Sequence, residues 1–270
     1  MLPMMESEVA SATRRLIILG SGTSTGVPTL GCDCSVCLSR DPRNHRTRPS
    51  ALFRLPQGDL LIDTTPEMRL QLLRENVRFV HAIAYTHDHA DHLMGLDDAR
   101  LFPKYIGGPV PVFCEERVED SIRRIFHYAF QQEVLSYPFG GVPRLAFRRI
   151  QPGIAFETLG ERVVPIRLDH GRIPVLGFRI GGLAYCTDVK RIPEESLPLL
   201  TDLDVLVLDT LRYEEHPTHL SLNESLALIE RLAPRRAVLT HLSHAFDHHA
   251  AEKTLPPHVR LAYDGLMIPF

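Results

Sequence analysis

The sequence contains no tryptophan and no apolar run near the roughly 18 residues of a membrane-spanning helix, so we expect no membrane partner. Neither sign of charge prevails, because 30 lysines and arginines stand against 33 aspartates and glutamates, a net charge of −3. Nucleic-acid-binding domains usually carry an excess of basic residues, so nucleic acid is not an expected partner. With 44% apolar residues, the composition is that of a globular protein with a substantial core.

The N-terminal segment is not typical of a secretory leader. It has no apolar stretch, and Glu6 and Glu8 precede its first arginines. We therefore predict a cytoplasmic protein. No linker or low-complexity stretch divides the chain, so we expect a single domain spanning 1–270, with residues 1–13 as a flexible N-terminal tail.

Histidine and cysteine, in contrast, are clustered. Several of the 14 histidines occur in groups, which is typical of metal sites. The five cysteines are an odd number, and three of them, Cys32, Cys34 and Cys37, lie within six residues. In a reducing cytoplasm such a cluster favours metal binding or catalysis over a disulfide framework.

Short apolar runs bounded by glycine, proline, aspartate or histidine predict buried strands along the whole chain. These runs cover residues 16–19, 51–55, 60–62, 82–85, 110–113, 163–168, 176–180, 183–185, 205–208, 238–239 and 261–268. Helices are predicted at 67–75, at 115–126 and after Ser221, which forms a capping box with Glu224. Hairpin turns are predicted at 56–59 and at Gly181-Gly182.

The two halves of the chain resemble one another. In the first half, residues 60–64 are followed by a helix and then by residues 83–87. In the second half, residues 184–188 are followed in the same way by a helix and then by residues 205–209. In both halves the strands end at polar residues that can gather along one edge. We therefore predict one α/β domain of two similar β-rich layers, with its site at the strand ends.

The strongest functional signal is the segment Thr86-His87-Asp88-His89-Ala90-Asp91-His92. It follows a predicted strand, whose two-residue period places His87 and His89 on one face. The turn that must follow directs Asp91 and His92 toward a second point. Four candidate ligands in six residues bring no structural benefit as a solvated loop, and they suffice for half of two adjacent metal sites.

Further candidate ligands lie where other predicted strands end. His170 follows the run at 163–168, Asp188 follows the run at 183–185, and His241 follows the run at 238–239. Each of them alone is typical of a surface residue or a hydrogen-bonded core residue. Together with the histidine loop, they form the pattern of a two-metal hydrolase.

The loop His87-x-His89-x-Asp91-His92 and these supporting positions resemble the metallo-β-lactamase superfamily of binuclear hydrolases over nearly the whole chain. The resemblance implies an α/β fold, an αββα sandwich of two similar β-rich halves with helices outside. Asp63, after the run at 60–62, matches an early aspartate that orients the histidine loop. The implied ligand set is His87, His89 and His170 for one metal ion, Asp91, His92 and His241 for the other, and Asp188 as a bridge.

Imidazole and carboxylate ligands without thiolate suit zinc, manganese or iron. The resemblance therefore implies two divalent metal ions, zinc or manganese, in the active site. Two such ions about 3.5–4 Å apart lower the pKa of a shared water and neutralise charge that develops on a substrate. The expected class is a metal-dependent hydrolase.

The cysteine cluster follows a turn at residues 19–28 that lacks the Gly-Lys-Ser/Thr ending of a phosphate-binding P-loop. Three thiolates need one more ligand to close a tetrahedral zinc site, and His45 and His244 are both candidates for that position. The cluster therefore predicts one structural zinc ion.

This turn, the cysteine cluster and residues 239–244 resemble the PhnP-type branch, which hydrolyses 5-phosphoribosyl 1,2-cyclic phosphate to ribose 1,5-bisphosphate. The resemblance implies that His244 is the fourth zinc ligand and that His219 protonates the leaving oxygen, with Asp188 and Asp63 as the other catalytic residues. It also implies a small phosphorylated substrate and a homodimer. It identifies no substrate-binding residue.

Three other functions fit parts of the pattern. A tRNA 3′-processing endonuclease shares the histidine loop, but that family carries a long basic arm with no counterpart in this sequence. A thioesterase of the glyoxalase II type does not have the cysteine cluster. A non-catalytic binding module would be expected to have lost some ligands, and all seven are present.

A basic stretch follows the cysteine cluster, at Arg40, Arg43, Arg46 and Arg48. It has two interpretations, a solvated face and a receptor for a second phosphate of the substrate. We also expect the neighbouring histidines His248 and His249 to be exposed.

Overall fold

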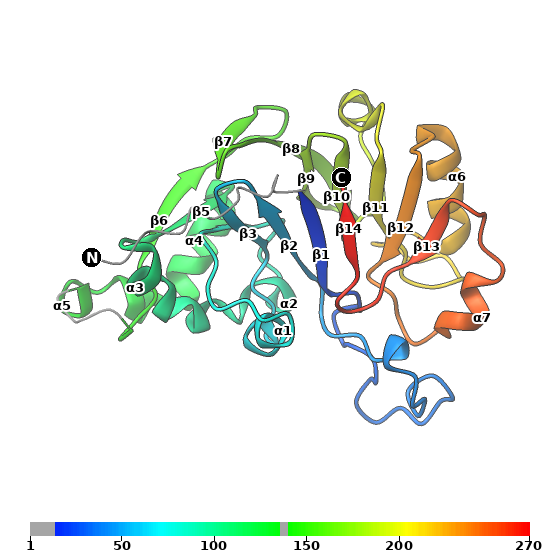
Figure 1. The fold of residues 1–270 in the computed structure, drawn as a ribbon, viewed down its shortest axis with the longest axis horizontal. Coiled ribbons are helices and arrows are strands. Elements are labelled where there is room, and N and C mark those ends of the chain that lie inside the picture. The colour runs from blue at the N-terminus through cyan, green and yellow to red at the C-terminus, as the bar shows by residue number, and fades with distance from the viewer. Residues whose placement is uncertain (1–13, 136–139) are drawn as a thin grey trace, which may run out of the picture.

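Figure 1 shows the fold in a computed structural model, which describes residues 14–135 and 140–270. The tail predicted at 1–13 lies outside the described residues. Two seven-stranded sheets form the centre of the molecule, with helices against them (Figure 1). Among the described residues, no helix has the length and apolar character needed to cross a bilayer.

The first sheet contains strands from the first half of the chain and the last strand of the protein. In spatial order, its strands are β14 (Met267–Pro269), β1 (Arg15–Gly20), β2 (Ser50–Leu55), β3 (Gly58–Ile62), β4 (Ala82–Ala84), β5 (Val110–Cys114) and β6 (Leu145–Arg149). Those of the second sheet are β13 (Val259–Leu261), β12 (Arg236–Thr240), β11 (Val205–Asp209), β10 (Leu183–Cys186), β9 (Ile173–Ile180), β8 (Glu161–His170) and β7 (Phe156–Thr158).

The helices connect these strands. The α-helices are α1 (Met68–Arg74), α2 (Ala90–Leu93), α3 (Phe102–Ile106), α4 (Glu116–Ile125), α5 (Gln132–Leu135), α6 (Leu222–Leu232) and α7 (His248–Glu252). Short 3-10 helices lie at Pro42–Asn44, Leu96–Leu101, His127–Phe130 and Glu194–Leu200. The helices predicted at 67–75, at 115–126 and after Ser221 are confirmed, and both hydrogen bonds of the capping box between Ser221 and Glu224 are present.

Strand directions confirm that the chain is built from two similar halves. In the first sheet β1, β2 and β3 pair antiparallel, and β3 to β6 pair parallel. In the second sheet β8, β9 and β10 pair antiparallel, and β10 to β13 pair parallel. Strands β3 and β10 therefore occupy equivalent places, as do β4 and β11, which is the correspondence that the sequence pattern predicted.

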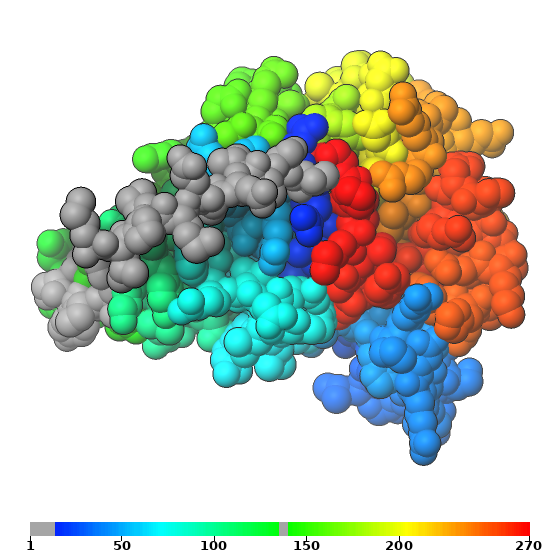
Figure 2. All heavy atoms as spheres, viewed as in Figure 1, coloured from blue at the N-terminus to red at the C-terminus, as the bar shows by residue number. Residues whose placement is uncertain are grey.

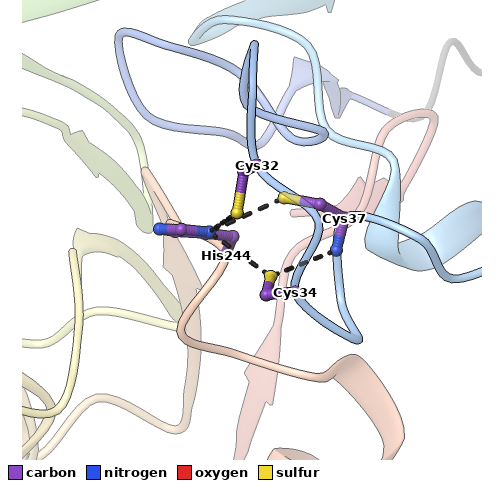
Figure 3. A group of neighbouring side chains, drawn as sticks. All are labelled: Cys32, Cys34, Cys37 and His244. Carbon is purple, nitrogen blue, oxygen red and sulfur yellow. Dashed lines mark hydrogen bonds between the residues drawn. The ribbon is translucent and has the colours of Figure 1, made fainter.

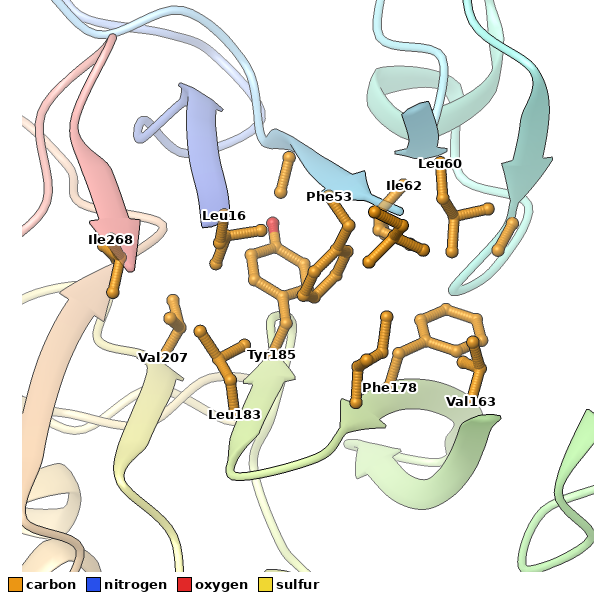
Figure 4. Close-up of a cluster of buried hydrophobic side chains, with 14 of the residues drawn as sticks. Leu16, Phe53, Leu60, Ile62, Val163, Phe178, Leu183, Tyr185, Val207 and Ile268 are labelled. Atoms are coloured by element: carbon orange, nitrogen blue, oxygen red, sulfur yellow. The ribbon is translucent and has the colours of Figure 1, made fainter. Parts of the chain in front are cut away.

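The sheets pack face to face through one apolar core, shown in part in Figure 4. Two further buried clusters lie on the outer faces: one joins the first sheet to α1 and α4, and the other joins the second sheet to α6. Two sheets between two helical layers are the αββα sandwich expected from the sequence. The residues labelled in the central core are Leu16, Phe53, Leu60, Ile62, Val163, Phe178, Leu183, Tyr185, Val207 and Ile268.

One predicted strand is wrong. The run at 261–268 forms no single strand, because β13 ends at Leu261 in the second sheet and β14 begins at Met267 in the first. Between them, the Asp264 carboxylate accepts hydrogen bonds from the backbone N–H groups of Ser21 and Thr47, each at 2.9 Å. These bonds to the first half of the chain hold the bend that carries the chain from one sheet to the other, a contact that apolar patterning does not reveal.

We expect Phe178→Ala to lower the free energy of unfolding by about 3–5 kcal/mol, because its fully buried ring fills the space between the sheets. Leu70→Ala is the control, since this leucine is 60% exposed and should change stability by less than about 0.5 kcal/mol. Urea unfolding of the two variants measures the difference. Equal small losses would show that the sheets are not held by this core.

Candidate metal centre

The polar ends of strands from both sheets meet at one edge of the sandwich. The first sheet contributes Asp63 after β3 and the histidine loop after β4. The second sheet contributes His170 at the end of β8, Asp188 after β10 and His241 after β12. The strands that carry these residues were all visible in the sequence, whereas the short helix α2 (Ala90–Leu93), which carries Asp91 and His92, was predicted only as a turn.

Three of these residues have left-handed backbone conformations. The φ angles are +61° at Asp63, +55° at Asp188 and +61° at His241. Aspartate tolerates this conformation, whereas a histidine adopts it at a cost of about 1–3 kcal/mol. The strain at His241 persists because the surrounding structure fixes it, and backbone strain of this kind is common at functional sites.

The structure brings His87, His89 and His170 together. Candidate ligand atoms of all three lie within 4.8 Å of one another. The rings of His87 and His89 are 4.5 Å apart between centroids, and those of His89 and His170 are 5.2 Å apart. Residues 83 positions apart in the sequence therefore share one potential cation site.

The other predicted residues gather around Asp188. Its Oδ1 atom lies 3.3 Å from His92 Nε2 and 3.3 Å from His241 Nδ1. Asp91 Oδ2 is 3.3 Å from the same His92 nitrogen. Asp188 also shares a 4.8 Å cluster with His87 and His92, and therefore lies between the two groups of histidines.

Hydrogen bonds behind the histidines fix how their rings face the site. The Nδ1 atom of His92 lies 2.7 Å from Asp63 Oδ2, and that of His87 lies 2.9 Å from Thr86 Oγ1. Asp63 also accepts hydrogen bonds from the Thr86 backbone N–H and hydroxyl at 2.8 and 2.7 Å. A histidine held through Nδ1 presents the lone pair of Nε2 to a metal ion.

The other ring nitrogens of these histidines, the Nε2 atoms, are free to bind a cation. The Nε2 atoms of His87, His92 and His241 are buried and have no hydrogen-bond partner in the described structure. A buried polar atom without a partner is costly, and three imidazole nitrogens of this kind in a group that includes Asp91 and Asp188 point to a divalent ion. The donor set of imidazoles and carboxylates fits zinc, manganese or iron.

Protonation of the site is governed by burial and by close charges. Burial lowers the pKa of His87 and His241, so both imidazoles stay neutral, as metal ligands must be. Burial also opposes a charged His92, but Asp188, Asp63 and Asp91 raise the pKa of His92 well above its ordinary value. Three carboxylates around one imidazole thus create a demand for positive charge that a divalent cation would also meet.

His219 lies at the same edge, in the segment between β11 and α6. Its ring centroid is 4.6 Å from those of His170 and His241, and its Nδ1 atom is 2.9 Å from Asp209 Oδ2. Burial lowers the pKa of His219, but the charge of Asp209 and this hydrogen bond outweigh it and raise the pKa to about 9. His219 is therefore protonated at neutral pH in this structure.

Asp209 is a residue of this site that the sequence pattern did not indicate. The fully buried carboxylate also accepts the backbone N–H of Val189 at 2.8 Å. The one signal was its position, because Asp209 ends the second-half strand that is equivalent to β4, the strand that leads into the histidine loop. Only the fold places His219 next to it.

The cysteine cluster forms a second, separate candidate metal site, shown in Figure 3. His244 Nδ1 lies 3.2, 3.5 and 3.6 Å from the sulfur atoms of Cys32, Cys34 and Cys37. His45, the other candidate, instead places Nε2 2.8 Å from the Ser39 carbonyl oxygen. A hydrogen bond from the Cys37 backbone lowers the pKa of Cys34 to about 6, which favours the thiolate that a metal ion requires.

Two predictions about neighbouring residues are wrong. Arg46 is 1% exposed and not part of a solvated face: its guanidinium donates hydrogen bonds to the carbonyl oxygens of Ser243 and Phe246 at 2.9 and 2.8 Å. His248, expected at the surface, is fully buried. Both corrections have one cause, because the segment after His241 folds back on the residues after the cysteine cluster, which lie about 200 positions earlier.

We expect Asp209→Asn to lower the pKa of His219 in the metal-free protein from its value of about 9, because burial is then opposed by one charge and one hydrogen bond to a carboxylate fewer. A raised pKa stabilises the fold fully below about pH 6.5, and this stabilisation is lost as the pH rises through about 9. The variant should therefore lose that pH dependence. Titration of the His219 ring proton by NMR measures the pKa, with exposed His249 as the internal control. An unchanged pKa would exclude Asp209 as its cause.

Comparison with known proteins adds the family. The family described as beta-lactamase superfamily domain matches residues 59–242. A crystal structure described as a new diphosphatase from the PhnP family is 41% identical, with a TM-score of 0.88, and the match covers 95% of this chain and 97% of that one. Zinc-bound PqqB from Methylobacterium extorquens shares the fold at 20% identity and a TM-score of 0.78, covering 95% of this chain and 100% of that one.

A curated relative carries a different name. The octanoyltransferase of Porphyromonas gingivalis is 40% identical over 255 residues, which are 93% of this chain. The chain spans about half the length of that relative, 51%, so the name describes a protein with a further half that is not matched. The family match, the solved structure and the strand-end histidines agree: this chain belongs to the metallo-β-lactamase superfamily and is a metal-dependent hydrolase.

Proposed function

We propose that this chain is a binuclear metal-dependent phosphodiesterase that hydrolyses a small cyclic phosphate such as 5-phosphoribosyl 1,2-cyclic phosphate. The observation that supports it best is the His219–Asp209 pair beside two groups of candidate metal ligands. When bound, two divalent ions would lower the pKa of a water molecule and neutralise charge on the phosphoryl oxygens. The protein must then supply orientation and a proton.

We assign His87, His89 and His170 to one ion, Asp91, His92 and His241 to the other, and Asp188 to both. The 3.3 Å approaches of Asp188 to His92 and His241 support a shared position for its carboxylate. Asp63 would act indirectly, because it binds His92 through Nδ1 and thereby fixes the direction of Nε2.

His219 is suited to donate a proton. Asp209 occupies its Nδ1 atom, which leaves Nε2 as the donor. In hydrolysis of a cyclic sugar phosphate, the bond between phosphorus and a sugar oxygen breaks, and this alkoxide is a poor leaving group. A proton passed from Nε2 to the departing oxygen would give a neutral hydroxyl, while Asp209 steadies the ring.

We also propose that Cys32, Cys34, Cys37 and His244 bind a structural zinc ion. Their approach within 3.2–3.6 Å of His244 Nδ1 supports four ligands around one centre. This ion would fasten the cysteine segment, a lobe that projects from the sandwich (Figure 2), to the segment that follows His241. A homodimer and a cytoplasmic location complete the proposal, and the sequence resemblance implies the first of them.

A second candidate is the hydrolysis of a diphosphate. It is favoured by the description of the 41% identical structure as a diphosphatase. The two reactions differ in their leaving groups, since a diphosphate releases a phosphate and has little need of a proton. A tRNA 3′-processing endonuclease is less well supported, because the sequence has a net charge of −3 and no long basic arm.

We expect Asp188→Ala to abolish phosphodiesterase activity and to lower bound metal to one ion or none per active site, because each ion loses a ligand. Asp202→Ala is a matched control, since Asp202 is also an aspartate with positive φ but is exposed. Metal analysis and activity toward bis(p-nitrophenyl) phosphate measure the effect. Two retained metals with near-normal kcat would refute the bridging assignment.

Cys34→Ser should remove one zinc ion per chain and lower Tm, while the catalytic ions remain partly bound, because structural zinc contributes directly to folding. Cys114→Ser tests a buried cysteine outside the cluster, and its zinc content should not change. Zinc analysis and thermal unfolding give the result. Unchanged zinc and Tm in Cys34→Ser would leave the cluster without this role.

His219→Ala should slow hydrolysis of a ribose 1,2-cyclic phosphate by about 10²–10⁴-fold, the usual contribution of a general acid. Hydrolysis of bis(p-nitrophenyl) phosphate should slow far less, because p-nitrophenolate leaves without a proton. Metal content should stay constant, as it should in the exposed control His249→Ala. Similar losses on both substrates would contradict the acid role. Rates equal to those of the unmodified protein on both substrates would place His219 outside the site.

A further inference from the structure

The turn between β8 and β9 packs against the segment that carries His219. His170 pairs with Ile173, so the turn contains only Gly171 and Arg172. A Cβ atom at Gly171, where φ is +64°, would lie 2.8 Å from Thr218 Cγ2, which shows how closely the two segments approach. His170 Nδ1 also lies 2.8 Å from the Thr218 carbonyl oxygen. The turn and residues 216–219 therefore form one wall beside the metal centre.

Arg172 is an exposed cation on this wall. In the described part of the chain no carboxylate lies within ion-pair distance of Arg172, although Glu214 and Glu215 are exposed on the adjoining segment. Other cations close to the strand ends are neutralised. Their pairs are Lys190 with Glu224, Arg191 with Asp169, and Arg117 with Asp88.

His216 supplies a donor on the same wall. The half-buried ring lies 5.3 Å from that of His219 between centroids. Its Nδ1 atom accepts a hydrogen bond from the Thr218 backbone N–H at 3.4 Å and lies 3.2 Å from the Thr218 hydroxyl. An Nδ1 that accepts leaves the ring proton on Nε2, which is then available to an anion.

Arg212 adds positive charge without a counterion. Its guanidinium donates to the carbonyl oxygens of Glu215 and Glu214, at 2.7 and 3.3 Å, rather than to a carboxylate. The segment 212–219 thus carries Arg212, His216 and His219, and it packs against the turn that contains Arg172.

The basic stretch after the cysteine cluster cannot fill this role. Arg46 is buried, Arg48 is paired with Glu67, and the Arg43 guanidinium lies 4.8 Å from the centre of the Tyr263 ring. The fourth arginine, Arg40, is exposed and has no ion pair among the described residues, but it lies in the cysteine segment and not on the segments that carry His170 and His219. The wall beside His219 therefore presents the free cation that adjoins the candidate acid.

We propose that Arg172 and His216 form a subsite for a second phosphoryl group of the substrate, on the leaving-group side of His219. The proposal rests on the proposed function, because it needs a phosphate ester held at the metal centre. An arginine and an imidazole donor suit a phosphoryl dianion. That group has two sources: an ester phosphate carried by the departing sugar, or the departing half of a diphosphate.

The test compares substrates with and without the second phosphoryl group. Ribose 1,2-cyclic phosphate and its 5-phosphorylated form differ in an ester phosphate alone, ADP-ribose carries a diphosphate, and bis(p-nitrophenyl) phosphate carries neither. We expect Arg172→Gln to lower kcat/KM about 10- to 100-fold on whichever substrate supplies the group. The change should stay below about twofold on bis(p-nitrophenyl) phosphate.

The matched control is Arg162→Gln. Arg162 is also exposed and lies near the start of β8, the strand that leads into the turn with Arg172, roughly 25 Å away at about 3.3 Å per residue. The control should change no rate by more than about twofold. His216→Ala should reproduce the selectivity of Arg172→Gln with a smaller loss, about 3- to 10-fold, and His216→Gln should recover part of it through its amide donor.

The substrate that responds identifies the source. A loss confined to the 5-phosphorylated sugar assigns the subsite to an ester phosphate, and a loss confined to ADP-ribose assigns it to a diphosphate. Equal losses on all substrates, or none on any, would overturn the subsite.

Failure of the proposed function can be distinguished from failure of the subsite. If the metal-loaded protein hydrolyses none of these compounds, the proposed function is wrong, and calorimetric titration with ribose 5-phosphate decides the subsite. Its Kd should rise about 10-fold or more in Arg172→Gln and stay constant in Arg162→Gln. An equal Kd in both variants would overturn the subsite independently of activity.

Discussion

The approach of Asp188 to His92 and His241 is the contact on which the site depends. The carboxylate is nearly fully buried, and burial of an ion costs several kcal/mol unless charge of opposite sign lies close to it. Burial acts to raise the pKa of Asp188, but His241 and His92 hold it well below its ordinary value. Because His92 belongs to the first half of the chain and Asp188 to the second, this contact also joins the two halves.

The duplicated fold gives equivalent strand ends different tasks. Asp63 and Asp188 follow equivalent strands, β3 and β10, and both have positive φ. Asp63 lies behind the histidine loop and holds His92 and Thr86, whereas Asp188 lies among the histidines themselves. The same turn therefore serves orientation in one half and ligand supply in the other, which is consistent with a single binuclear centre between two similar halves.

Two segments far apart in sequence border the site, and their charges differ in kind. In the cysteine segment Arg46 is buried, Arg48 is paired with Glu67 and Arg43 packs on a ring, and Arg46 binds the segment that follows His241. The wall of residues 170–172 and 212–219 presents a cation without a counterion. Under the proposed function, catalysis would belong to the strand ends and substrate choice to the connecting segments beside them.

Much of this protein was determined by its sequence alone. Apolar runs predicted ten of the fourteen strands in the described residues, β1 to β5 and β8 to β12, but they did not predict β6 or β7. They also indicated two similar β-rich layers and the approximate ends of β4, β8, β10 and β12, and the family resemblance added the αββα sandwich. These predictions succeed because strand periodicity, capping and turn residues act locally. The seven candidate ligands were located in the same way, since each lies at the end of a predicted strand or in the loop and short helix that follow one, and their role as ligands stays a prediction.

Tertiary structure decided what depends on distant approach. It split residues 261–268 between two sheets, buried Arg46 and His248, chose His244 over His45, and placed Asp209 behind His219. None of these has a local signal, because each depends on segments that lie far apart in the chain or on a turn that only packing fixes. A charged side chain has the same appearance in sequence whether it meets water or a buried carbonyl oxygen, and only the fold determines which of the two it finds.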